Sequence, residues 1–527
     1  MKKIFSLFLV SIACTTAFGA TAENDMYFRA MQDEMNRTLK ELRLPGELRP
    51  YYVAYMVTDN QSMRLTASLG ALFPQRDSHS LNTTVFVHIG NDKKNNTGYF
   101  NRDNSWRYRA TETAPYSYEG IRQALWSASY NQYLESVEQY KEKEAYLRKK
   151  NIKDLKPDVI PAPQATYIEP LPAWQPADTE PLKNWLQTIS LRGKEVPFLI
   201  DFSVGLEQTQ NNRYYLNSRG AKAQYPRRYY ACWVRASFRQ PDGGKENLYT
   251  TLDLRDFSAP ELARAEQEVE RFLTKAQGLY GAKEAEYYLG PVLYKPTAAA
   301  KFLQKTLRPN LENIVPLFNS KSAEDTTASS WRKKIGRRVM SPGITVYDRP
   351  QASTYKGIEL YTFTPVDIEG VAGQDLTIIS GGRLRQVPLS ERPLELKNHR
   401  SNGHAWFDDY GVREDTTALF IEPEVPLTDE QMEEKLLARC KELELPYCYI
   451  KEGSFFQRVY TQDGRKEWVL GLTDNLSERS LRDILAAGGE EKLVYSNIIT
   501  PSLLVDEVEL EPQDRRPDRK PLIEKPE

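Results

Sequence analysis

The sequence predicts an α+β protein of two domains, with mostly antiparallel sheets and flanking helices. Three observations lead to this prediction. The chain has 527 residues, more than one hydrophobic core normally holds. Several β-rich segments follow one another with short turns between them, as in an antiparallel meander. Amphipathic helical patterns lie beside these groups of strands and supply the flanking layers.

The N-terminus has the order of a secretory signal peptide. Lys2-Lys3 precede the apolar run Ile4–Ala13, and small residues follow as far as Ala20-Thr21-Ala22. We therefore assign residues 1–22 to a signal peptide, expect cleavage near Ala22, and expect export to the periplasm or the extracellular space. No later segment reaches the roughly 18 apolar residues of a membrane-spanning helix, so no membrane span is predicted.

Composition and cysteine content narrow the function classes. The chain is 40% hydrophobic and 27% charged, with a net charge of −1, so no global field suggests nucleic acid as a partner. Beyond the signal, Cys232, Cys440 and Cys448 remain. A Cys440–Cys448 bridge and buried free thiols are both open, and no C-x-x-C or Cys/His zinc pattern is present.

The first predicted domain spans residues 23–289. Apolar residues at helical spacing predict helices over 24–45, 118–151 and 180–190, and Ser258 with Pro260 begins another that runs to 278. Six prolines between Pro157 and Pro176 indicate a crossing loop. Strands are predicted over 51–58, 63–72, 83–89, 197–210, 212–224, 227–239 and 247–256, with turns at Asn211-Asn212 and at Asp242-Gly243-Gly244.

The second predicted domain spans residues 290–511, and a disordered tail covers 512–527. Paired glycines Gly381-Gly382 predict a hairpin between strands at 375–380 and 384–389. Thr428 with Gln431 forms a capping box at the start of a helix over 428–444. The remaining expected elements are a strand over 292–294, a helix over 297–307, an apolar segment over 358–363, strands over 447–451, 455–460, 466–472 and 503–510, a mobile loop over 319–330 and a short helix over 480–487.

An acidic turn and a later polar tetrapeptide are the candidate site. Asp367 and Glu369 are paired carboxylates of the kind that act as acid and base, and His404 could line a pocket with them. The interpretation that we favour from the sequence is that the two carboxylates cap a turn and pair with Arg383 or Arg385. His399 and His404 lie five residues apart around a turn, which favours backbone-bonded roles over a metal pair.

Several short motifs occur in an order that resembles the TldD/PmbA (TldE) family of metallopeptidases, also called modulators of DNA gyrase. The resemblance covers most of the mature chain, and from about Gly290 to Leu510 it is to the family's C-terminal domain. The motifs are Gly290-Pro291-Val292-Leu293-Tyr294, Ile335-Gly336-Arg337-Arg338-Val339, Ile344-Thr345-Val346-Tyr347-Asp348-Arg349-Pro350, Asp367-Ile368-Glu369-Gly370 and Ser401-Asn402-Gly403-His404.

The resemblance implies a zinc site that this chain does not repeat. Active members carry an H-E-x-x-x-H helix, whose imidazoles hold zinc while the glutamate activates water, together with a later cysteine ligand. The corresponding segment here, residues 300–309, contains no His, Glu, Asp or Cys, and residues 483–505 contain no Cys. The chain therefore resembles the TldE/PmbA side of the family, and zinc is expected only in a catalytic partner.

These points predict a catalytically silent subunit that shapes or positions a peptide or unfolded protein segment in a peptidase assembly. The expected partner is a TldD-like catalytic paralogue, in a dimer or higher oligomer, with strand addition at sheet edges as the mode of peptide binding. The alternatives are an exported non-enzymatic binding or scaffold protein, and an active peptidase with an unrecognised site. The expected substrate surface comprises Asp367, Glu369, Gly370, Ser401, Asn402, Gly403 and His404.

Overall fold

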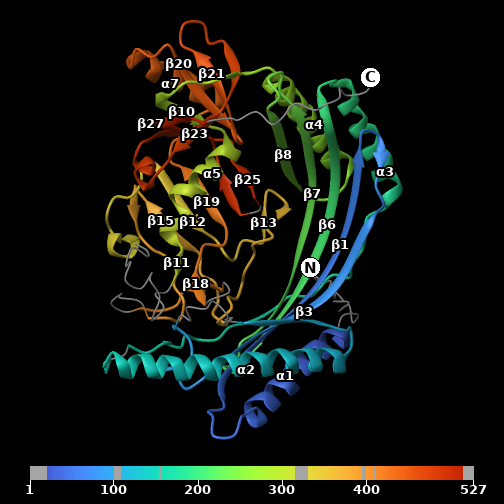
Figure 1. The fold of residues 1–527 in the computed structure, drawn as a ribbon, viewed down its shortest axis with the longest axis vertical. Helices are drawn as coiled ribbons and strands as arrows, with labels where there is room; N and C mark the ends of the chain where they lie inside the picture. The colour runs from blue at the N-terminus through green and yellow to red at the C-terminus, as the bar shows by residue number, and fades with distance from the viewer. Residues whose placement is uncertain are drawn as a thin grey trace, which may run out of the picture.

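The computed structural model describes residues 21–99, 109–153, 156–314, 330–393, 399–407, 411–495 and 497–513. It confirms the α+β class: several mostly antiparallel sheets are flanked by helices (Figure 1). The long strands of the N-terminal half form one curved sheet, and the C-terminal half stands beside its concave side. The predicted signal residues 1–20, loop residues 319–329 and tail residues 514–527 lie outside the described residues.

The large sheet has the order β4-β3-β1-β6-β7-β5, with β2 pairing with β1 and β8 pairing with β7. Its central strands pair antiparallel over most of their length, which keeps the register continuous across the sheet. The strands are β1 (Pro50–Ser68), β2 (Ala71–Leu72), β3 (Arg76–Ile89), β4 (Ala110–Ala114), β5 (Thr166–Ile168), β6 (Leu199–Asn217), β7 (Lys222–Arg239) and β8 (Lys245–Leu254).

The turn predicted at Asn211-Asn212 is wrong, because both residues lie inside β6. They are buried, and β6 is paired on both sides at this point, with β1 through Asn60 and with β7 through Arg227. The chain instead reverses after β6, where Gly220 has a φ of +102°. Similarly, the two strands predicted over 51–58 and 63–72 are one strand, β1, for most of their length. Asparagine favours turns, but two neighbouring strands supply its backbone with partners here.

Four helices cover the large sheet at its two ends. Near one end, α1 and α2 pack on β1, β3 and β6 around a core that includes Met31, Tyr55 and Leu125. At the other end, α3 and α4 cover a second core that includes Phe202 and Val269. These helices are α1 (Thr21–Glu41), α2 (Tyr118–Lys149), α3 (Thr179–Leu191), with the 3-10 turn η1 (Arg192–Glu195) after it, and α4 (Ala259–Leu279).

The C-terminal half contains two further large sheets, with α5 packed between them (Figure 1). One has the order β23-β27-β10-β20-β21-β22-β9, with β24 on β27, and the other is β16-β15-β12-β19-β26-β25. The first comprises β9 (Lys283–Glu284), β10 (Tyr288–Tyr294), β20 (Tyr447–Glu452), β21 (Phe455–Tyr460), β22 (Lys466–Leu470), β23 (Leu472–Asn475), β24 (Ile484–Ala487) and β27 (Leu503–Pro512). The second comprises β12 (Ile344–Asp348), β15 (Leu376–Ser380), β16 (Arg383–Leu384), β19 (Leu419–Pro423), β25 (Lys492–Val494) and β26 (Ile498–Thr500).

Smaller elements complete this half. They include the three-stranded sheet β11-β18-β17 and the two-stranded sheet β13-β14. Their bounds, with those of the helical segments, are β11 (Asn313–Ile314), β13 (Thr354–Tyr355), β14 (Ile358–Glu359), β17 (Ala405–Phe407), β18 (Val412–Glu414), α5 (Pro296–Thr306), α6 (Arg308–Leu311), η3 (Ser330–Lys334), α7 (Asp429–Glu442) and η4 (Glu478–Arg482). No described helix has the length and apolarity needed to cross a membrane.

Two predictions for this half need correction, and one is confirmed. The helix predicted over 480–487 is a short 3-10 turn followed by β24, because Ile484 pairs with Val505 at the side of β27. The predicted hairpin forms around Gly381-Gly382, but β16 has only two residues. The second strand was expected to extend to residue 389, but the backbone at Val387 and Leu389 is instead hydrogen-bonded to the Asn402 side chain. The capping box at Thr428 is present as predicted.

Candidate functional site

At the predicted acidic turn, the C-terminal half is bonded to the large sheet. Asp367 accepts three backbone hydrogen bonds, from Glu369 and Val371 through Oδ1 and from Ala405 through Oδ2, at 2.9–3.0 Å. Tyr215 of β6 donates to the Ile368 carbonyl at 2.8 Å. Asp367 therefore caps the turn, and the turn is bonded to the sheet.

A network of carboxylates extends from this turn. Glu369 Oε2 accepts from the Glu391 backbone N–H at 2.6 Å. The Glu391 side chain in turn accepts from Arg219 at 2.5 Å and from the Ala162 N–H at 2.8 Å. Arg219, and not Arg383 or Arg385, thus pairs with this network, through Glu391. Arg383 is exposed and donates to the Gly336 carbonyl.

Burial dominates the electrostatics of this junction. It raises the pKa of Asp367 to about 7, although the three backbone donors act in the opposite direction. Burial and the neighbouring Glu391 and Asp367 raise the pKa of Glu369 well above its usual range. Burial also raises the pKa of Glu391, while the bonds from Ala162 and Arg219 lower it. Burial therefore acts in the same direction on all three side chains, toward the protonated form, and the bonds from N–H groups and Arg219 oppose it.

The second predicted segment, Ser401–His404, is equally enclosed. Asn402 bonds the backbone of residues 387–389, and His404 Nδ1 donates to the Asn402 carbonyl at 2.9 Å. His404 Nε2 lies 3.1 Å from Asp348 Oδ2, and both side chains are fully buried. Gly403 has a φ of +76°, and a Cβ there would lie 2.2 Å from the Ala372 carbonyl oxygen. Only glycine fits this position.

The structure thus brings the predicted site residues together, but it encloses them. Ala405 bonds to Asp367 and links the two segments, while each of the seven residues proposed as substrate surface is buried. Contact of these residues with a substrate stays a prediction. His399 bonds the Ser390 carbonyl at 2.7 Å, and among the described residues no group of three His, Cys, Asp or Glu side chains has an arrangement that could hold a metal.

A site that the sequence reasoning missed lies on α5, the helix that corresponds to the zinc helix of the resemblance. Its apolar side, including Ala299, Phe302 and Leu303, packs into the core. Its open side carries Lys301 and Lys305, one helical turn apart. Lys305 and the buried Lys451 of β20 both donate to Asp474, at 3.0 and 2.5 Å. Ammonium groups repel a metal cation, so this side of α5 does not fit a zinc site.

Two more lysine contacts complete this group. Lys301 donates to the Ser454 hydroxyl at 2.6 Å. Lys275 of α4 donates to the Glu452 carbonyl at 2.8 Å, 3.5 Å from that residue's carboxylate. We call Lys275, Lys301, Lys305 and Lys451, with Asp474 and Glu452, the lysine cluster. It places four ammonium groups against two carboxylates.

The pKa values show that these charges affect one another. Burial lowers the pKa of Lys301, and Lys275 and Lys305 lower it further. Burial also lowers the pKa of Lys451, while Asp474 raises it. For Asp474, burial acts to raise the pKa, but Lys451 and Lys305 outweigh it and hold the pKa below its usual value. A carboxylate shared by two lysines leaves the cluster with excess positive charge.

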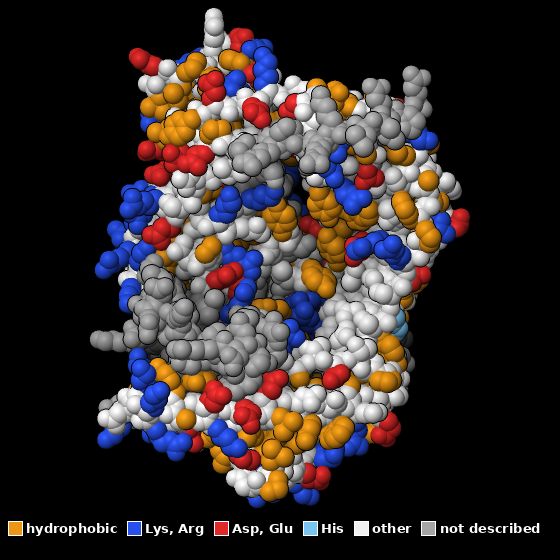
Figure 2. Space-filling model, in the orientation of Figure 1, with side chains coloured by type: hydrophobic (Ala, Val, Ile, Leu, Met, Phe, Trp, Pro, Cys, Tyr) orange, Lys and Arg blue, Asp and Glu red, His pale blue; other side chains and the backbone are white. Residues whose placement is uncertain are grey.

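A cavity of about 360 Å³ lies between the two halves, and Arg271 of α4 lines it. Lys275 of the lysine cluster lies one helical turn further along the same helix, next to the cavity. Figure 2 shows this face of the molecule hollowed between the large sheet and the C-terminal half, with Lys and Arg side chains at the hollow. The cavity is lined by Thr251, Leu252 and Asp253 of β8, Arg255, Arg264, Gln267, Glu268 and Arg271 of α4 and its approach, Tyr355, Lys356 and Ile358 near β13-β14, and Glu491, Lys492 and Leu493 at β25. Together we call the cavity and the lysine cluster the basic cleft.

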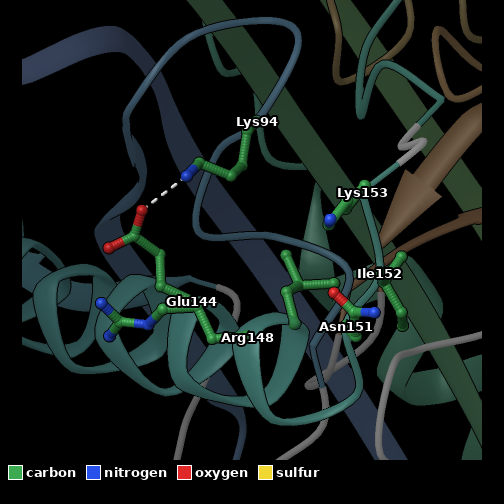
Figure 3. A pocket seen from close by; sticks show the side chains of 7 residues that line it. Lys94, Glu144, Arg148, Asn151, Ile152 and Lys153 are labelled. Atoms are coloured by element: carbon green, nitrogen blue, oxygen red, sulfur yellow. Dashed lines mark hydrogen bonds and ion pairs between the residues drawn. The ribbon is translucent and has the colours of Figure 1, made fainter.

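A second cavity, of about 330 Å³, lies at the C-terminal end of α2 (Figure 3). Lys94 and Glu144 form an ion pair across one side at 2.5 Å, and the exposed Arg148 lies on the next turn of the helix. Three cations, Arg148, Lys149 and Lys150, lie at this end of α2, where positive charge complements the helix dipole. Its chemistry is that of a solvated helix end.

Comparisons with known proteins agree with this architecture. Residues 288–445 match the sequence family of the PmbA/TldA metallopeptidase C-terminal domain. The fold is similar to that of a proposed modulator of a DNA gyrase from Thermotoga maritima (14% identity, TM-score 0.60, 92% of this chain and 100% of that one). It is also similar to TldE from Thermococcus kodakarensis (15%, 0.59, 92% and 100%) and to a proposed modulator of DNA gyrase from Bacteroides thetaiotaomicron (13%, 0.60, 93% and 99%). No curated protein sequence matches the chain.

Proposed function

We propose that this chain, which belongs to the PmbA/TldD family through its C-terminal domain, is the non-catalytic subunit of a peptidase assembly and positions the peptide substrate there. The observation that carries the proposal is the open side of α5. Lys301 and Lys305 occupy that side, and Lys305 is paired with Asp474. The helix that supplies zinc ligands in active relatives therefore presents ammonium groups in this chain.

The architecture suits positioning of an extended peptide. Within the described sheets, β8 pairs only with β7 and β25 pairs only with β26, so each leaves one edge open. Residues of both strands line the same cavity. Open strand edges bind extended peptides through backbone hydrogen bonds. In this proposal a TldD-like partner carrying H-E-x-x-x-H supplies zinc and the water-activating glutamate, and this chain supplies the surface that holds the substrate.

The proposal includes export, because the first 22 residues have the order of a signal peptide. The mature protein is then expected to begin near Glu23. N-terminal sequencing of protein recovered from the periplasm or the medium tests this point. Protein that retains Met1 and stays in the cytoplasm would contradict it.

Native mass spectrometry with metal analysis tests the assembly. The purified chain alone is expected to hold no zinc and to show no chelator-sensitive peptidase activity. Co-expression with an H-E-x-x-x-H paralogue from the same genome is expected to give a complex that contains zinc and cleaves unfolded protein. One tightly held zinc on the single chain, or cleavage by that chain in the presence of a chelator, would contradict the proposal.

A further inference from the structure

The basic cleft carries a charge opposite in sign to that of the whole chain. The chain has a net charge of −1, but the lysine cluster has four ammonium groups against two carboxylates. Two of these lysines are largely buried, whereas the Lys305 side chain is 54% exposed. The side chains of Lys451 and Lys275 are 9% and 15% exposed. Holding such groups near one another costs free energy unless an anion is bound among them.

The cations continue along α4 into the cavity. Arg264, Arg271 and Lys275 recur at spacings of seven and four residues, which places them on one side of the helix. From Arg264 to Lys275 this row is roughly 16 Å long, the length of about five residues of extended chain. Some of the charge is already neutralised, because Glu261 pairs with Arg264 and Glu268 lies 3.5 Å from Arg271.

Opposite α4, Lys492 on the open-edged strand β25 faces the same cavity and is exposed. A single small anion would satisfy one end of this row only. A chain with carboxylates spaced along it would satisfy the row as a whole. The open edges of β8 and β25 add a row of backbone donors and acceptors, with which an extended peptide can pair as an added strand. Both features favour a peptide as the occupant.

We infer that the basic cleft binds an acidic, extended peptide segment, with its carboxylates on the lysine cluster and its backbone along the open strand edges. This inference rests on the proposed function and names the substrate class. In this arrangement Lys301 is the first contact, because its described partner is the neutral Ser454 hydroxyl. Lys305 can turn from Asp474 to the ligand, since Lys451 continues to neutralise that carboxylate.

Fluorescence anisotropy with two labelled peptides tests the inference on the purified full chain. One peptide alternates glutamate with serine, and the other has glutamine in place of every glutamate. The acidic peptide is expected to bind about tenfold or more tightly, and its affinity is expected to fall as salt is raised. Equal affinity for the two peptides, or no binding of either, overturns the inference.

Matched variants locate the site. Lys301→Gln with Lys305→Gln should weaken acidic-peptide binding about tenfold, and so should the independent pair Arg271→Gln with Lys492→Gln. Lys149→Gln with Lys150→Gln removes the same charge from the exposed end of α2 and should leave binding unchanged. Equal losses in the α2 variant would show a non-specific charge effect and overturn the inference.

Two further outcomes separate this inference from the proposal on which it rests. Tighter binding of a single-stranded oligonucleotide of equal charge would overturn the peptide assignment. Equal binding of both peptides, together with a zinc-containing active complex in the co-expression experiment, would overturn the acidic preference and leave the positioning subunit intact. Failure of the complex itself would be seen in that experiment and not in the peptide titration.

Discussion

Replacement of Asp474 by asparagine tests the electrostatic account of the lysine cluster most directly. The Asp474 side chain is 2% exposed and accepts hydrogen bonds from Lys451, Lys305 and the Tyr294 hydroxyl. Asparagine keeps the shape and removes the charge. Lys451, whose side chain is 9% exposed, then loses the carboxylate that neutralises it. Leaving a buried charge without its partner costs about 3–5 kcal/mol.

Urea unfolding of the purified chain measures this loss through the midpoint at constant m-value. The matched control is Asp474→Asn combined with Lys451→Met, which removes both charges and should recover most of the lost free energy. The wild-type dependence on pH follows the same logic. The pKa of Asp474 is below its usual value in the folded state, so its contribution is present above the unfolded pKa and is lost as pH falls through the folded pKa. A loss below about 1 kcal/mol for Asp474→Asn, or a double variant no more stable than the single one, would refute the argument.

Three further predictions concern stability. Gly403→Ala should lower the unfolding free energy by about 3 kcal/mol or more, because a Cβ there would clash with backbone atoms, whereas Gly464→Ala, at a similar φ with open space around it, should lower it by only about 1–2 kcal/mol. Equal losses in thermal unfolding would contradict the steric argument. Thr428→Ala should cost about 1 kcal/mol by removing the cap of α7, and Thr428→Ser, which keeps the hydroxyl, should be close to wild type in urea unfolding. The pKa of Asp367 is raised to about 7 in the folded state, so its contribution to stability is fully present below the unfolded pKa near 4 and is lost as pH rises through about 7, by up to roughly 4 kcal/mol. A combined Asp367→Asn and Glu369→Gln variant should reduce this dependence of the unfolding free energy on pH. An unchanged pH dependence would show that other groups cause it.

Local sequence signals predicted the elements whose causes are local. The long stripe of apolar residues predicted a helix over 118–151, and α2 runs from Tyr118 to Lys149. The capping box at Thr428 and the glycine pair before β16 are likewise complete within a few residues. Where pairing with a neighbouring strand determines the backbone conformation, the local sequence preference gave a wrong prediction. Asn211 and Asn212 suggest a turn in isolation, but β1 and β7 bond them on both sides within β6.

In the candidate site, too, local features could be predicted from the sequence and long-range partners could not. The sequence indicated Asp367 as a turn cap, and the structure shows that role because Asp367 bonds the backbone within four residues of itself. It could not indicate that Arg219, about 150 residues earlier in the chain, would be the partner of the carboxylate network. The lysine pair on α5 was visible as two cations one turn apart on the polar side of an amphipathic helix. Its significance depends on Lys451 and Asp474, which only the fold brings there.

The lysine cluster and the carboxylates at the junction of the two halves (Asp367, Glu369 and Glu391) differ in how their charges are compensated. At the junction, backbone N–H groups and Arg219 satisfy the carboxylates, so these side chains fix two halves of the molecule together. In the cleft, Asp474 is shared by two lysines, and Lys301 is held by a neutral hydroxyl. A structural role alone would be served as well by apolar side chains of similar size. An excess of positive charge beside open strand edges is instead what recognition of an acidic peptide requires, because the ligand supplies the missing carboxylates.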